Sequence, residues 1–248
     1  MTTATVLDDR PTRRAQLLLT CGVVGPPLFV VALLVEGATR PGYSTWRNAG
    51  SQLSTGPWGW TQITNFILCG LLVAAAAVGL RQVLRAQGGR GSNWGPVLVG
   101  SFGLSLVVAG GFVTDPGLGY PPGTPLRAGG PTTWHGLVHG LNGLVAFGSL
   151  TAASFVFARR YAAQPGARAG ARCSLVNGIV QLVLFFGSIP LGNLVENGTL
   201  TNPPIGLLQR IQIATGWAWL ALVALRELRT LPGASAAQHP APEPKLSA

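Results

Sequence analysis

Two histidines four residues apart, His135 and His139, are the residues of this chain best suited to chemistry. On a helix this spacing puts both side chains on one face, so both imidazoles can reach one metal ion. A third ligand would complete a catalytic zinc site, and Asp115 is the natural candidate, either as a ligand or as the carboxylate that orients an imidazole. The pair lacks the glutamate of the H-E-x-x-H motif. Three interpretations therefore stay open: a zinc site, a polar or proton-handling site without metal, and structural hydrogen bonding at a helix start.

Three further polar residues are expected to join the histidine pair in a ligand-binding site. Asn142 continues the helical face that carries His139, whereas Glu36 and Arg210 lie near the ends of long apolar runs. Ionisable groups at membrane depth usually face the interior of a helix bundle or a wet cavity. Arg210 needs a partner at that depth, and the sequence offers Glu196 or the phosphate of a lipid headgroup.

Six long apolar runs must position these residues. A helix needs about 20 apolar residues to cross the hydrocarbon core of a bilayer, and lipid offers no partner to unpaired backbone groups, which excludes irregular spans. The composition agrees, because only 10% of the 248 residues are charged, against about 25% in soluble domains. We therefore predict an all-α integral membrane bundle of six transmembrane helices, with spans at about 15–35, 61–80, 95–114, 136–158, 173–195 and 206–225.

The distribution of basic residues predicts the orientation of these spans. Of the 17 Lys and Arg residues, thirteen fall in the two tails and in the second and fourth loops, and four fall on the other side: Arg40, Arg47, Arg127 and Arg210. Basic loops stay in the cytoplasm, so both termini are predicted to be cytoplasmic in a bacterial plasma membrane. The tails are 1–14 and 229–248, the second expected to be disordered. The arginines are spread over several loops, which favours anionic lipid headgroups on the cytoplasmic face as partners and excludes a compact nucleic-acid-binding module.

Several short motifs resemble one known family. The chain resembles the bacterial and archaeal "domain of unknown function 998" family of six-span membrane proteins over about residues 15–228, and the motifs that carry the resemblance are Arg40-Pro41-Gly42-Tyr43, Ser51-Gln52-Leu53-Ser54, Gly56-Pro57-Trp58-Gly59-Trp60, Phe112-Val113-Thr114-Asp115-Pro116 and His135-Gly136-Leu137-Val138-His139. The resemblance implies no established activity. It does imply that Ser51, Asp115, His135 and His139 stand at signature positions, which makes them the candidate catalytic residues.

The chain departs from that family at two positions and shares a looser similarity with a second group. Asn48 stands where a histidine is common, and Gln52 where an acid is common. A metal-dependent member would therefore be short of ligands here. The chain is also loosely similar to the alkaline-ceramidase-like membrane hydrolases, which combine a serine, an aspartate and three histidines. Ser51 or Ser44 could supply the serine, but a third histidine is missing.

Three functions remain possible from the sequence. The first is a membrane protein that binds a lipid or other amphiphile in an outward-facing polar site. The second is a metal-dependent hydrolase of lipid esters or amides, in which zinc would activate a water molecule. The third is a small-molecule transporter, which would need a polar path through the bundle. The polar residues of the fifth run, from Ser174 to Ser188, keep this third reading open.

Overall fold

The predicted all-α fold is confirmed by the computed structural model, which describes residues 10–126, 132–196 and 198–232. The described residues form six α-helices, one 3-10 helix and no strand: α1 Arg10–Thr39, η1 Gly50–Ser54, α2 Gly59–Gln87, α3 Trp94–Gly111, α4 Trp134–Ala162, α5 Arg168–Glu196 and α6 Ile205–Arg229. Helices α1 to α5 are long and apolar enough to cross a membrane. Helix α6 does not meet the same combined criterion of length and hydropathy. It carries charged residues near both of its ends.

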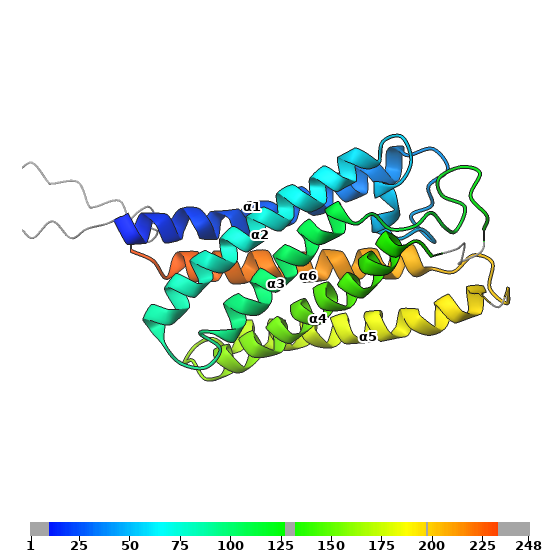
Figure 1. Cartoon of the computed structure of the whole chain (residues 1–248). Coiled ribbons are helices and arrows are strands. Elements are labelled where there is room, and N and C mark those ends of the chain that lie inside the picture. Colours follow the sequence, from blue (N-terminus) through cyan, green and yellow to red (C-terminus); the bar gives the residue numbers. More distant parts are fainter. Residues whose placement is uncertain (1–9, 127–131, 197, 233–248) are drawn as a thin grey trace, which may run out of the picture.

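The six helices form a closed ring. Each helix packs against the next one in the chain, and α6 closes the ring against α1. Figure 1 shows an elongated bundle in which the first and last described residues lie at one end, beside the α2–α3 and α4–α5 turns. A hydrogen bond of 2.9 Å from the Gln16 side chain to the Pro232 carbonyl joins the two chain ends. The 40–58 loop and the segment 112–126 lie at the opposite end.

Large apolar side chains cover the outside of the bundle as well as its core. Leu71, Leu104 and Val183 are 54%, 59% and 63% exposed, and in water so extended an apolar surface would drive aggregation. Inside the ring, Trp217 and Phe157 are fully buried. Apolar residues on both faces are what a helix needs when its outer face contacts lipid.

Small residues and polar pairs hold the helices together. A side chain at Gly70 would meet the backbone oxygen of Gly103 at 2.7 Å, so α2 and α3 can approach this closely only because both residues are glycines. Between neighbouring helices of the ring, Asn177 of α5 donates to Ser154 of α4 at 2.9 Å, and Trp219 of α6 donates to Ser174 of α5 at 3.0 Å. Such contacts are the usual means of association between membrane helices, where lipid removes the hydrophobic driving force.

Several helix boundaries differ from the predicted spans. Helix α3 ends at Gly111, before the predicted limit at 114, and Phe112 after it has an extended backbone. Residues 113–116 have no regular secondary structure. Asp115 precedes Pro116 and is therefore disfavoured in helical conformation. Helix α1 begins at Arg10, within the predicted tail 1–14, and α2, α4 and α5 continue beyond their predicted ends. The predicted spans include only the apolar residues, whereas the helices continue into the polar residues that flank them. Most of the predicted disordered tail, 233–248, lies outside the described residues.

Candidate functional site

Both histidines are anchored to the end of α3 by the same ring nitrogen. The Nδ1 atom of His135 lies 3.0 Å from the Val113 carbonyl oxygen, and that of His139 lies 2.7 Å from the Phe112 carbonyl oxygen. A carbonyl oxygen only accepts, so Nδ1 must carry the hydrogen in each ring. In the neutral imidazole Nε2 is then an acceptor. The backbone carbonyls just after α3 thus fix the orientation and the tautomer of both side chains.

Asp115 reaches His135 through Thr133. The carboxylate accepts hydrogen bonds from the Thr133 backbone nitrogen at 3.0 Å and from its hydroxyl at 2.5 Å, and that hydroxyl oxygen lies 3.0 Å from Nδ1 of His135. Thr133 also caps α4, because its hydroxyl accepts from the Gly136 nitrogen at 3.1 Å. A carboxylate beside a helix N-terminus is stabilised by the helix dipole. Asp115 and His135 therefore belong to one network, which serves first as the cap of α4.

Gly136 allows this cap to form, and it offers a test. A Cβ at Gly136 would lie 2.0 Å from Oδ2 of Asp115, whereas a Cβ at Gly140, one turn later, would meet nothing within 4 Å. We expect Gly136→Ala to lower the free energy of unfolding by about 1–3 kcal/mol, as overpacking does, while Gly140→Ala stabilises the helix slightly. Unfolding of the purified protein in mixed micelles, followed by tryptophan fluorescence, measures both. Equal effects of the two substitutions would show that Asp115 does not occupy this position.

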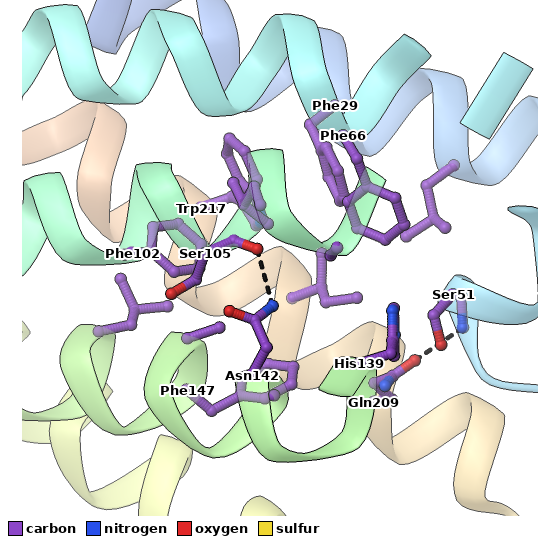
Figure 2. A pocket seen from close by; sticks show the side chains of 18 of the residues that line it. Phe29, Ser51, Phe66, Phe102, Ser105, His139, Asn142, Phe147, Gln209 and Trp217 are labelled. Carbon is purple, nitrogen blue, oxygen red and sulfur yellow. Dashed lines mark hydrogen bonds between the residues drawn. The ribbon is translucent and has the colours of Figure 1, made fainter. Parts of the chain in front are cut away.

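His139 and Ser51 line a common cavity of about 130 Å³ between α1, η1, α2, α3, α4 and α6. Most of its wall is apolar and aromatic, with Phe29, Phe66 and Trp217 prominent in it. Figure 2 shows Ser51, His139 and Gln209 together at one end of the cavity, with Phe102 and Trp217 farther in. Asn142 also lines it and donates a hydrogen bond of 2.8 Å to the Ser105 carbonyl. None of the lining residues carries a permanent charge.

A buried amide donor faces no partner beside this cavity. Gln62 is fully buried and lines the cavity, and its Nε2 atom has no hydrogen-bond partner among the described residues. Its Oε1 atom accepts from Asn65 at 3.2 Å, and Asn65 donates from the same nitrogen to the Phe29 carbonyl. The Phe29 carbonyl can only accept a hydrogen bond, so the Asn65 atom that faces it is the amide nitrogen. The same nitrogen faces the Gln62 side chain, which must therefore present its oxygen to Asn65 and leave Nε2 on the other side. A buried donor without a partner is rare in folded proteins.

Two predicted members of the site, Glu36 and Arg210, lie outside the lining of this cavity. Glu36 pairs with Arg40 at 3.1 Å. Arg210 donates to the carbonyl oxygens of Thr45, Asn48 and Gly206 at 2.9–3.0 Å, and to the Tyr43 hydroxyl. The structure therefore places Arg210 against the backbone of the 40–58 loop, whereas the Glu196 side chain lies outside the described part of the chain.

Tyr43 completes the attachment of this loop. Burial raises the pKa of Tyr43 to about 12, although the neighbouring Arg210 acts in the opposite direction. The phenol is therefore neutral at physiological pH and keeps its hydrogen. It donates towards the carbonyl oxygens of Asn48 and Ala49, at 3.1 and 2.9 Å. Arg210 and Tyr43 together fix the loop that carries Ser51.

Asn48 and Gln52, the two departures from the family pattern, join the loops at this end of the bundle. Asn48 is fully buried and donates to the Leu118 carbonyl at 3.0 Å and to Oε1 of Gln52 at 3.1 Å. Gln52 donates to the Gly117 carbonyl at 2.7 Å. Each amide therefore donates to a backbone carbonyl, which a carboxylate at the position of Gln52 could not do. Within residues 10–126, 132–196 and 198–232, no three His, Cys, Asp or Glu side chains are grouped so as to hold a metal ion.

Three residues of this region, Thr133, Gln62 and Gln209, were not part of the site predicted from the sequence. Thr133 could have been found, because a threonine just before a helical run is a typical N-cap. Gln62 and Gln209 gave no such signal, since neutral amides in apolar helices are usual contacts between helices. Gln181 is a similar amide in an apolar helix, and it serves as a contact between helices by donating to the Gln212 carbonyl at 2.9 Å. Gln62 and Gln209 differ from it only in that they line the cavity.

The comparisons with known proteins agree with the motifs. The family model described as "Protein of unknown function (DUF998)" matches residues 23–226. No curated protein and no solved structure matches the chain.

Proposed function

The chain belongs to the DUF998 family of proteins of unknown function, and from its cavity we propose that it binds one uncharged amphiphilic molecule within the membrane. The observation that carries the proposal is the unpartnered Gln62 donor at an apolar, aromatic cavity that also contains His139. An oxygen of the ligand would accept from Gln62, and a hydroxyl or amide hydrogen would be donated to Nε2 of His139. The apolar part of the molecule would lie against Phe66 and Trp217.

The charge and size of the cavity narrow the class of ligand. An ionised headgroup would lose its hydration beside Ser51, His139 and Gln209 without gaining a counter-charge, which is unfavourable by several kcal/mol. A hydroxyl, ester or amide headgroup does not carry that penalty. The volume of about 130 Å³ is close to the roughly 150 Å³ of an engineered cavity that binds benzene. It therefore suits the headgroup and the first carbons of a chain.

The proposal includes a membrane topology. All six helices cross the bilayer of a bacterial plasma membrane, both termini are cytoplasmic, and the cavity lies nearer the outer leaflet. The closed ring supports α6 as a span despite its charges, because α6 packs between α1 and α5. The basic residues of the turns after α2 and α4 support the orientation.

Gly143 offers a direct test of ligand binding. It lines the cavity, and a Cβ there would meet nothing within 4 Å. We expect Gly143→Leu to fill the space and to weaken binding of a spin-labelled monoacylglycerol by about tenfold or more, the equivalent of 1.4 kcal/mol. The measurement is quenching of tryptophan fluorescence in the purified protein, because Trp217 contributes to the wall of the cavity.

Gly148→Leu is the matched control for this experiment. Gly148 is an exposed residue of the same helix, lies outside the cavity lining, and also has open space at its Cβ position. It should leave binding within about twofold of the wild type, as surface substitutions do. The proposal is wrong if wild type shows no saturable quenching, or if both leucine variants weaken it equally.

The hydrolase alternative is favoured by one observation, that Ser51 and His139 line the same cavity. Release of fatty acid from the bound monoacylglycerol, lost in Ser51→Ala and in His139→Gln, would establish turnover. The transporter alternative has less support, because Asn177 and Gln181 in α5 are hydrogen-bonded to neighbouring helices.

A further inference from the structure

A second, larger chamber lies at the other end of the bundle. It has a volume of about 430 Å³ and is formed by the ends of α2, α4 and α6 together with the turn after α2. The charged side chains that line it are Arg90, Arg160, Arg226 and Glu227. It shares no residue with the apolar cavity. Its lining includes three guanidinium groups and a single carboxylate.

Arg160 shapes the chamber and brings a buried positive charge to it. The side chain is 3% exposed. It donates to the carbonyl oxygens of Gly88 and Arg90 at 2.8 and 3.0 Å, and to Oε1 of Gln87 at 2.7 Å. Its Nε atom has no partner among the described residues. These contacts hold the turn in place, but neutral oxygens leave the charge of Arg160 uncompensated.

The single carboxylate of the chamber is directed elsewhere. Glu227 is 2% exposed and accepts hydrogen bonds from the Tyr161 hydroxyl at 3.0 Å and from Nε2 of Gln87 at 3.3 Å. No salt bridge joins Glu227 to Arg160 in the described part of the chain, and the Gln87 amide lies between them. A partly buried excess of positive charge favours an anionic partner, because unpaired buried charges are destabilising.

Arg226 and Arg90 leave donors for such a partner. The guanidinium of Arg226 stacks over the Tyr161 ring at 4.5 Å and donates to Gln164 at 3.4 Å, which holds the side chain at the wall of the chamber. Arg90 is exposed and lies in the turn held by Arg160. Two guanidinium groups at the wall of a cavity suit the oxygens of one phosphate, which arginine binds in bidentate fashion.

We propose that this chamber binds a phosphate group through Arg90 and Arg226, positioned by Arg160. The volume leaves room for more than the phosphate, so the group belongs either to the headgroup of an anionic lipid or to a small phosphorylated molecule from solution. This inference is independent of the apolar cavity and of its ligand.

The test compares two double variants of the full chain in phosphatidylcholine nanodiscs. The first is Arg90→Gln with Arg226→Gln. The second, Arg85→Gln with Arg229→Gln, removes the same charge from the ends of α2 and α6 without touching the chamber lining. The probes are glycerol 3-phosphate added in solution and phosphatidic acid included in the nanodisc. Binding is measured by calorimetry for the first and by native mass spectrometry for the second.

We expect the chamber variant to weaken binding of at least one probe by about tenfold or more, because it removes both phosphate-binding guanidinium groups. The control should weaken binding by less than about threefold, because Arg85 and Arg229 lie outside the chamber lining. Binding of glycerol 3-phosphate would assign the site to a soluble molecule, and binding of phosphatidic acid alone to a lipid headgroup. Equal losses in both double variants, or the absence of saturable binding of either probe to wild type, would overturn the proposal. Unchanged thermal unfolding without probe shows that the variants are folded.

Discussion

Replacing Arg210 by methionine is expected to lower the free energy of unfolding by about 3 kcal/mol or more, because hydrogen bonds made by a charged group contribute about 1.5–3 kcal/mol each. Arg210 is 8% exposed and donates to three carbonyl oxygens and to the Tyr43 hydroxyl. Methionine keeps much of the side-chain volume but provides no donor. The carbonyls of Thr45 and Asn48 would then remain buried without this partner, and each loses its share of stabilisation.

The control for this prediction lies on the same helix. Arg229 is exposed at the end of α6, and Arg229→Met should change the free energy of unfolding by less than about 0.5 kcal/mol. Both variants are measured by titration with sodium dodecyl sulfate in mixed micelles, followed by tryptophan fluorescence. If Arg210→Met proved as stable as the control, the guanidinium would not hold the loop in the folded protein.

The loss of Arg210 should also reach the apolar cavity. The 40–58 loop carries Ser51 into the cavity wall, and Gln209 accepts a hydrogen bond from the Gly50 nitrogen at 2.7 Å. A loop released from Arg210 would no longer close this end of the cavity. Arg210 therefore acts on ligand binding through the position of the loop, although it is not part of the lining.

The sequence predicted the helices, and it predicted that His135 and His139 lie on one helix, because both features follow from regular spacing. Apolar runs of about 20 residues identify membrane helices, and the spacing of His135 and His139 identifies one helical face. The same rule could have found the pairing of Glu36 with Arg40, which are also four residues apart.

The partners of Arg210 and the aromatic wall follow no such regularity. Arg210 meets backbone carbonyls of a loop whose path depends on its own buried side chains, and no spacing in the sequence indicates these partners. Phe29 and Trp217 stack inside the ring with their centroids 4.3 Å apart. In the sequence they resemble Phe186, which is 60% exposed on the outer face. A membrane helix is apolar on both faces, and composition does not distinguish the wall of a cavity from a surface that contacts lipid.

Gly206→Ala should weaken the same loop attachment by a steric route. A Cβ at Gly206 would lie 2.4 Å from the Asn48 oxygen and 2.8 Å from the Thr45 oxygen. Both are backbone atoms, so the whole loop would have to move away from α6. We expect a loss of about 1–3 kcal/mol in the free energy of unfolding. Gly148→Ala, where a Cβ meets nothing within 4 Å, should be neutral or slightly stabilising.

The double variant of Gly206→Ala and Arg210→Met separates one shared attachment from two independent ones. Both substitutions act on the Thr45 and Asn48 carbonyls, so a loop already displaced by one has less to lose from the other. We expect the two effects to fall short of additivity by about 1 kcal/mol, within the range seen for residues that share partners. Additive effects in the same detergent titration would mean that the helix and the loop are held together at separate places, and that Arg210 stabilises α6 without fixing the loop that carries Ser51.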